Sequence, residues 1–299
     1  MISIACPSGI ARTYQLEVCV NPNQGQVEAW NGGESVHYVD HADRYDRQLA
    51  AFTTALMERA AISADDAVLD IGCGSGATTL MAAANAHRVL GLDISHPLIE
   101  VAAHRAAEAG VDNVDFIVAD AQTYGFADGE FTLVMSQFGL MFFDDPEGAF
   151  ANLRRSLAPG GRLSFVCWQG LEANEWLMVV GREVAKHCDL PDLGGRAGGP
   201  GMFALMRPDE TIALLEAAGF TEVDVDPITT TVLLAGGDTV EESLDFLLGM
   251  GMVRGLLGRL DGDAREQAVE EIRAALADRY EPDVGVTLGA AGWLVSARC

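Results

Sequence analysis

The chain has 299 residues, of which 49% are hydrophobic and 21% charged, enough to bury the core of one large globular domain or of a domain with a smaller lid. Lys and Arg number 19 and Asp and Glu number 44, so the formal net charge is -25. Because so acidic a surface repels phosphate backbones and anionic lipids, we expect neither nucleic acids nor membranes as partners.

The six cysteines are scattered, without a CxxC pair or any metal-ligand spacing. Free thiols in a reducing cytosol are the simplest interpretation. The first residues, MISIACPSG, show no basic stretch followed by an apolar one, and no apolar run reaches membrane-spanning length. We therefore expect a cytoplasmic protein without a bound metal, as a monomer or a homodimer.

Residues 1–60 are predicted to form an N-terminal arm and covering helices. Up to about residue 35 the chain is weakly patterned and holds several Pro and Gly, which favours an irregular arm with one short strand over Tyr14–Val20. From Val36 to Ala61 the pattern predicts a helix, because one apolar stripe recurs at helical spacing. The stripe consists of Leu49, Phe52, Leu56 and Met57.

Residues 61–170 alternate between apolar strands and helical segments, which predicts a parallel sheet with helices on both faces. The expected strands are Ala67–Ile71, Val89–Asp93, Val114–Ala119, Phe131–Ser136 and Arg162–Trp168. The expected helices are Ala77–Ala86, Pro97–Ala109 and Pro146–Leu157.

The alternation stops at Gln169, and residues 171–206 are predicted to form a lid insertion over the sheet. It would hold a helix over residues 171–188 and a mobile Gly-rich loop over Pro191–Gly201 that opens and closes. Residues 207–299 would complete the core, with a helical insertion over 238–283. The other elements expected there are a helix over Pro208–Ala218, a strand or hairpin over Thr221–Leu234 and a last strand over Val286–Ser296.

The stretch Val68–Gly76 joins a strand to a helix through glycines at alternate positions, Gly72, Gly74 and Gly76. Glycines there allow a tight turn and the close approach of a ligand, and the unpaired N–H groups of the following helix can hold its polar part. Alone this is a weak signal, although the G-x-G-x-G spacing differs from the G-x-G-x-x-G of dinucleotide-binding folds.

Four expected strands have a polar residue at or next to their carboxyl end. These residues are Asp70, Asp93, Asp120 and Ser136. In open parallel sheets, ligands bind at these carboxyl ends, beside the switch in strand order. Asp93 could accept hydrogen bonds from both hydroxyls of a ribose, and Asp120 could accept one from a purine amino group. Each acid alone could instead be a helix N-cap or a turn residue, but this alternative does not explain the whole set together with the glycines.

Five of these stretches occur in the order typical of one family: Val68–Gly76, Gly91–Ser95, Val118–Ala121, Phe131–Ser136 and Leu157–Arg162. Over about residues 40–170 the chain thus resembles class I S-adenosylmethionine-dependent methyltransferases. The resemblance implies a Rossmann-like, seven-stranded α/β sheet with an antiparallel last strand, flanked by helices. One departure is Thr132, where such proteins often carry an acid.

The resemblance implies S-adenosylmethionine as the cofactor. The glycines would line its methionine part, and the carbonyl of Ser136 would bind its amino-acid end. Asp93 would accept hydrogen bonds from the ribose hydroxyls, and Asp120 would accept one from the adenine amino group. The residues that it assigns to cofactor binding are Asp70, Gly72, Cys73, Gly74, Gly76, Asp93, Ile94, Asp120, Ala121 and Ser136.

A narrower resemblance is carried by Trp30–Gly33, Gln137–Pro146 and Trp168 with Asn174 and Trp176. It is to bacterial small-molecule methyltransferases related to quinone C-methylating and natural-product enzymes, which often show Arg in place of Gln137. It implies a small, largely apolar metabolite as substrate. Candidate pocket residues are Trp30, Tyr38, Tyr45, Gln137, Met141, Trp168, Trp176, Met202 and Phe203, although many Met and aromatic residues at such spacings are core.

Methyl transfer from a sulfonium requires an acceptor in line with the methyl group, and a base where the acceptor must lose a proton. His37 and His41 are the candidate bases, because they lie in the segment that covers the cofactor in such folds. The alternative is that both belong to a solvated helix face, since their neighbours are mostly polar.

Two other functions stay open. One is a protein of the same fold that binds S-adenosylmethionine without transferring a methyl group, or that catalyses another reaction. The other is a nicotinamide-dependent dehydrogenase, which the G-x-G-x-G spacing disfavours.

Overall fold

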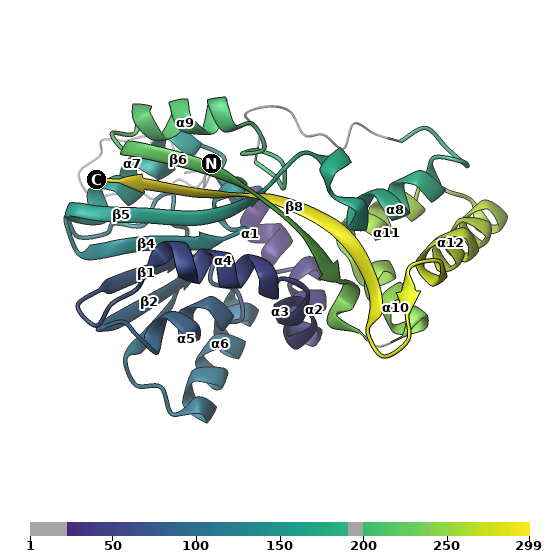
Figure 1. Cartoon of the computed structure of the whole chain (residues 1–299), viewed down its shortest axis with the longest axis horizontal. Coiled ribbons are helices and arrows are strands. Elements are labelled where there is room, and N and C mark those ends of the chain that lie inside the picture. The colour runs from purple at the N-terminus through teal and green to yellow at the C-terminus, as the bar shows by residue number, and fades with distance from the viewer. Residues whose placement is uncertain (1–22, 191–199, 238) are drawn as a thin grey trace, which may run out of the picture.

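The computed structural model describes residues 23–190, 200–237 and 239–299, and its main feature is one mixed sheet (Figure 1). Along the sheet the strands follow the order β3-β2-β1-β4-β5-β8-β6. Their bounds are β1 (Ala67–Ile71), β2 (Arg88–Asp93), β3 (Val114–Val118), β4 (Phe131–Gln137), β5 (Leu157–Trp168), β6 (Thr221–Leu233) and β8 (Gly285–Arg298). The two-residue β7 (Tyr280–Glu281) pairs with the start of β8.

The pairing confirms a largely parallel sheet with an antiparallel last strand. β1 to β5 pair in parallel, and β8 is antiparallel to both β5 and β6. The strand order reverses between β1 and β4, since β2 and β3 continue on one side and β5 on the other. The carboxyl ends of β1 and β4 therefore border the crevice where such sheets bind ligands.

Helices cover the sheet in two groups. Figure 1 shows α4 (Ala50–Ala60), α5 (Ala77–Ala83) and α6 (His96–Ala109) on one side and α7 (Pro146–Ser156) with α9 (Pro208–Ala217) on the other. The strand side chains alternate between the two groups. Val68, Leu133 and Met135 pack with Ala60 and Ala82, whereas the buried residues Leu69, Val134 and Phe165 lie in the larger core with Phe150 and Leu153.

The N-terminal segment is more helical than predicted. Instead of an irregular arm up to residue 35, the described part holds α1 (Gln24–Trp30) and α2 (Gly33–Asp40). Instead of one helix from Val36 to Ala61, the chain forms α2, α3 (Ala42–Gln48) and α4, because His41 and Leu49 adopt non-helical φ/ψ angles. The strand predicted over Tyr14–Val20 lies outside the described residues.

A helical lobe gathers at the far end of β6 and β8, at the right of Figure 1. It consists of α8 (Glu175–Val184), α10 (Val240–Gly249), α11 (Gly251–Leu257) and α12 (Gly262–Ala277). The helix predicted over residues 171–188 is shorter than expected, since the 3-10 turn η2 (Leu171–Ala173) precedes α8. Most of the predicted mobile loop, residues 191–199, lies outside the described residues.

Two further 3-10 turns, η1 (Leu140–Phe142) and η3 (Leu234–Gly236), follow β4 and β6. β5 begins earlier than predicted, at Leu157 rather than at Arg162, and its pairing with β4 shifts register between Phe131 and Leu133. Within the described ranges, no helix combines the length and the apolar character that crossing a membrane requires.

Candidate functional site

A pocket lies at the carboxyl ends of β1 to β4, with α1 and η1 also contributing to its wall. The predicted cofactor residues that line it are Gly72, Gly74, Asp93, Ile94, Asp120 and Ala121. The predicted substrate residues that line it are Trp30, Tyr38, Gln137, Met141, Trp168 and Met202. The structure thus brings both groups to one pocket.

The loop between β1 and α5 turns on glycines in the left-handed region, with φ of +64° at Gly72 and +54° at Gly74. The backbone N–H of Gly72 donates to the carbonyl of Leu92 at 2.8 Å, which ties the loop to β2. Gly76 does not line the pocket, because it faces α6, where an added Cβ would come within 2.8 Å of Ala102. Cys73 is buried beneath the same loop, away from the pocket lining.

Asp93, the last residue of β2, holds the loops on either side of it. One carboxylate oxygen accepts the N–H of Gly74 at 2.8 Å and the other accepts the N–H of Ser95 at 2.8 Å. Burial raises the pKa of this carboxyl group, and these backbone hydrogen bonds oppose the rise. Each oxygen has a second lone pair, so the carboxylate can also accept from a ligand in the pocket.

Asp70 occupies the end of β1 but does not line the pocket. It is fully buried, and one of its oxygens accepts from the hydroxyls of Thr78 and Thr79, both at 2.7 Å. Burial raises its pKa to about 6. Asp70 therefore ties the end of β1 to the first turn of α5 and fixes the path of the loop between them.

Asp120, two residues beyond β3, aims a carboxylate at the pocket. Its Oδ1 accepts from the N–H of Gln122 at 3.0 Å and from the side-chain amide of Asn23 at 3.3 Å. Its Oδ2 is buried and has no hydrogen-bond partner among the described residues. A buried oxygen of this kind is costly unless a ligand donates to it.

Ser136 is also buried outside the pocket lining. Its hydroxyl donates to the carbonyl of Ile71 at 2.7 Å and accepts the N–H of Gly139 at 3.2 Å. It therefore joins the end of β4 to the end of β1.

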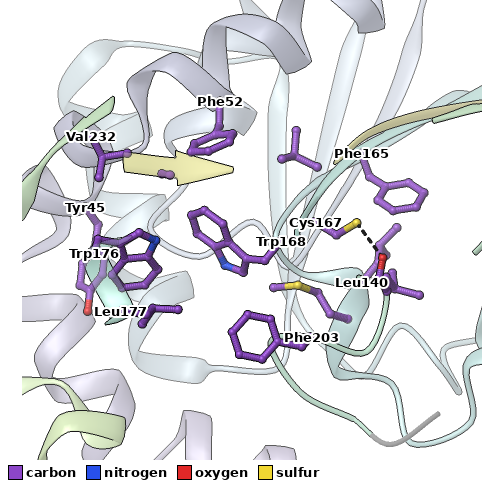
Figure 2. Packing of buried hydrophobic residues seen from close by; sticks show 14 of the residues in the cluster. Tyr45, Phe52, Leu140, Phe165, Cys167, Trp168, Trp176, Leu177, Phe203 and Val232 are labelled. Atoms are coloured by element: carbon purple, nitrogen blue, oxygen red, sulfur yellow. Dashed lines mark hydrogen bonds between the residues drawn. The ribbon is translucent and has the colours of Figure 1, made fainter. Parts of the chain in front are cut away.

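Stacked aromatic rings form the wall of the pocket next to β5. Phe138 stacks on Trp168 with ring centroids 3.9 Å apart, and Phe52 meets both rings edge-on. Figure 2 shows Trp168 between Phe52 and Phe203. Phe138 holds a φ of +60°, a conformation that is rare for a bulky side chain. Such local strain is maintained by its surroundings and is often found at functional sites.

Tyr45, Trp176 and Phe203 were predicted in the pocket but lie behind its lining. All three are buried (Figure 2). Tyr45 stacks on Tyr38 with centroids 3.8 Å apart, and Trp176 packs against Trp168 at 5.3 Å. Tyr45 and Trp176 thus pack behind two rings of the lining.

His37 and His41, the predicted bases, do not line the pocket. α2 directs His37 toward α10, where Gly249 lies so close that an added Cβ would be 2.6 Å from the imidazole. Burial, and secondly the neighbouring His41, lower the pKa of His37 to about 4. Among the described residues, the titratable side chains that line the pocket are Asp93, Asp120 and Tyr38.

Several site residues were not among the predicted ones. Asn23 and Gln26 line the pocket from the start of α1, and Gly139 lines it after β4. Asn31 holds α1 in place, since its side chain donates to the carbonyl of Ile94 at 3.0 Å and accepts the N–H of His96 at 2.9 Å. The motif Trp30–Gly33 was the only sequence signal for this contact.

Comparison with known proteins matches residues 69–165 to the family described as "Methyltransferase domain". Aklanonic acid methyltransferase DauC of Streptomyces sp. is 38% identical over 40% of this chain and 58% of its own length. Demethylmenaquinone methyltransferase of Thermus thermophilus is 33% identical over 52% of this chain and 74% of its own length. The 27-O-demethylrifamycin SV methyltransferase of Amycolatopsis mediterranei is 32% identical over 66% of this chain and 70% of its own length.

The chain spans only about half the length of several of these relatives, such as 58% of DauC and 47% of an uncharacterized Mycobacterium bovis protein. Among solved structures, the YcgJ protein of Bacillus subtilis superposes with a TM-score of 0.56 at 18% identity, over 83% of this chain and 98% of that one. Phosphoethanolamine N-methyltransferase 2 of Haemonchus contortus superposes with a TM-score of 0.57 at 17% identity, over 93% of this chain and 60% of that one. At these identities the structures establish the shared fold.

Proposed function

Since the chain belongs to the class I S-adenosylmethionine-dependent methyltransferases, we propose that it methylates a small, largely apolar metabolite, at oxygen, nitrogen or carbon, in the pocket described above. The observation that carries this proposal is the pairing, in one pocket, of the Gly72 and Gly74 loop with two strand-end carboxylates. S-adenosylmethionine supplies a methyl group activated on a sulfonium.

The polar groups on the cofactor side of the pocket suit this molecule. Asp93 has lone pairs left for the ribose hydroxyls, and the unpaired Asp120 Oδ2 suits the adenine amino group. Ile94 and Leu98 offer apolar contacts to a purine, and the backbone of Ala121 can hold a ring nitrogen. Gly72 and Gly74 leave room for the methionine part.

Asp70 and Ser136 support this binding from behind the lining. Asp70 orders the glycine loop through Thr78 and Thr79, and Ser136 would offer its backbone carbonyl to the amino-acid end. Cys73 and Gly76 belong to the same loop and fix its path.

The other half of the pocket would hold the acceptor. Phe138, Trp168, Trp30, Phe142 and Met202 give it aromatic and apolar walls. The described parts of residues 171–206 would serve as the lid, with residues 23–60 and 239–283 as further covering segments around the core. A place in natural-product metabolism fits the relatives named for aklanonic acid and a rifamycin.

Positioning carries the reaction in this proposal. Holding an acceptor in line at contact distance supplies several kcal/mol of a displacement barrier, about 7–11 kcal/mol in favourable cases. An acceptor hydroxyl that ionises readily, or an enol-type carbon, then needs no strong base from the protein. His37 and His41 would serve the packing of α2 instead of proton transfer.

Calorimetry with S-adenosylmethionine and, separately, NAD tests the cofactor. We expect binding of the first alone, and preferential binding of NAD would contradict the proposal. Incubation with metabolite extracts then tests the reaction, because an acceptor should gain the mass of one CH₂ while S-adenosylhomocysteine accumulates. Cofactor binding without any methylated product across such extracts would favour the non-methylating alternative.

A further inference from the structure

One buried amide oxygen near the aromatic wall has no role in the proposal so far. Gln137 is the last residue of β4 and lines the pocket. Its Oε1 is buried and has no hydrogen-bond partner among the described residues. Because an unsatisfied buried acceptor destabilises the fold, its retention in a ligand pocket indicates that a bound molecule satisfies it.

Because side chains alternate along a strand, Gln137 projects from the face of the sheet that α4 covers. Met135, two residues earlier in β4, packs with Ala60 of α4, and Gln137 pairs with Val166 of β5. Trp168, two residues after Val166, projects to the same face, where Phe52 of α4 meets its ring at 5.2 Å.

Gln137 is therefore a neighbour of the Phe138 and Trp168 stack. The two carboxylates on the cofactor side lie at the ends of strands beyond β1 in the sheet, since Asp93 ends β2 and Asp120 follows β3. The Gln137 oxygen is thus placed to contact the substrate that receives the methyl group.

We propose that Gln137 is a specificity residue. Its Oε1 accepts a hydrogen bond from an O–H or N–H group of a flat aromatic substrate. The oxygen of a neutral amide can only accept hydrogen bonds, so the substrate must provide the O–H or N–H donor. The stacked rings beside it favour a planar partner, because aromatic pairs prefer offset-stacked or edge-on contact. This inference rests on the proposed function, since it assumes that the acceptor occupies this half of the pocket.

The test measures binding of two probes, indole and benzofuran, to the protein saturated with S-adenosylhomocysteine. The probes share size and shape, but indole has an N–H group where benzofuran has an oxygen. We expect the wild-type protein to bind indole about tenfold more tightly, as expected for a site that loses one buried hydrogen bond with the wrong ligand.

Gln137→Met, which keeps the chain length without the acceptor oxygen, should bring this ratio close to unity. Gln137→Glu, which keeps an acceptor oxygen, should preserve the preference for indole, and both variants should keep the wild-type affinity for S-adenosylmethionine. Gln267→Met, at an exposed position of α12, is the matched control and should keep the ratio.

An unchanged ratio in Gln137→Met, or no binding of indole to the wild type, would overturn the inference. A tenfold loss of S-adenosylmethionine affinity in Gln137→Met would also overturn it, because Gln137 would then serve the cofactor. If the wild-type protein fails to bind S-adenosylmethionine at all, the proposed function fails instead. The melting temperature of each variant shows that it is folded.

Discussion

Gly72 and Gly139 meet with their backbones in contact at the switch between β1 and β4. A Cβ on Gly72 would lie 2.8 Å from the Cα of Gly139, and a Cβ on Gly139 would lie 3.0 Å from the Cα of Gly72. Both residues line the pocket. The loops after the two strands can therefore approach this closely only without side chains, and the shape of the pocket depends on that approach.

Gly139→Ala tests this contact. The new methyl group would also fall 2.7 Å from the carbonyl oxygen of Ile71, so the two loops must separate. We expect a loss of about 1–3 kcal/mol in the free energy of unfolding and at least tenfold weaker binding of S-adenosylmethionine. Gly125→Ala is the control, because nothing lies within 4 Å of its added Cβ. Wild-type cofactor affinity in Gly139→Ala would contradict this reasoning.

Asp93→Ala should weaken the binding of S-adenosylmethionine, measured by calorimetry. Each charge-assisted hydrogen bond that the ribose loses is worth about 1.5–3 kcal/mol. The loss should exceed one such bond, since the same carboxylate also positions the N–H groups of Gly74 and Ser95. Asp115→Ala, at an exposed position of β3, serves as the control. An unchanged dissociation constant would show that the ribose binds elsewhere.

Arg162→Leu should destabilise the fold by about 3–5 kcal/mol at pH 7, measured by chemical denaturation. Arg162 donates two hydrogen bonds to the buried carboxylate of Asp66, at 2.8 and 2.9 Å, and its removal would leave that carboxylate without a charged partner. Arg207→Leu, which removes only an exposed pair with Glu210, should cost less than about 1 kcal/mol.

The effect of Arg162→Leu should also depend on pH. Hydrogen bonding to Arg162 holds the pKa of the Asp66 carboxyl group well below its ordinary value of 3.8. A lowered carboxyl pKa stabilises the folded state above the unfolded pKa, and this contribution is lost as the pH falls below it. The difference between the wild type and Arg162→Leu should therefore shrink in acid below about pH 4. A difference that stays constant through that range would argue against the ion pair as its source.

His37→Gln should remove part of the acid sensitivity of the protein. The pKa of His37 falls from 6.5 to about 4 in the folded state, so the unfolded chain binds the proton more tightly. Stability is then lost as the pH falls from about 6.5 toward 4, by up to about 3 kcal/mol. His104→Gln, on the exposed face of α6, should leave the slope unchanged. A wild-type slope in His37→Gln would mean that other groups cause the acid sensitivity.

Local patterns predicted the first half of the sheet closely. The strand over Ala67–Ile71 has the expected bounds, and the strands that carry Asp93 and Ser136 differ from expectation by one residue at one end. These are short, β-branched, buried runs that end at an acid or a turn, so sequence alone marks both ends. The alternation of Val68 and Leu69 between two cores follows from the same geometry.

The breaks at His41 and Leu49 could not be predicted in this way. The helical pattern over Val36–Ala61 shows no break at either residue, while their backbone angles follow from tertiary contacts. α3 is held by such contacts, since Arg47 donates to the carbonyl of Gly236 and Gln48 accepts the N–H of Ala235. For a similar reason Asn23 and Gln26 were not predicted, because the position of α1 depends on Asn31.

The sequence does not show which of the predicted aromatic residues line the pocket. Tyr45, Trp176 and Phe203 have the same apolar character as lining residues, and only packing decides which ring faces the pocket and which lies behind it. The roles of the predicted site residues, His37 and His41 included, stay predictions, and the variants above test those of Asp93 and Gln137.

β8 is synthesised after every other strand, yet it lies in the sheet between β5 and β6. While the ribosome makes α10, α11 and α12, β6 has no strand to pair with and one edge of β5 stays open. Both are templates for pairing with another chain until residues 285–298 emerge. A chain that terminates before Gly285 thus keeps unpaired edges, and we expect it to aggregate instead of persisting as a partly active fragment.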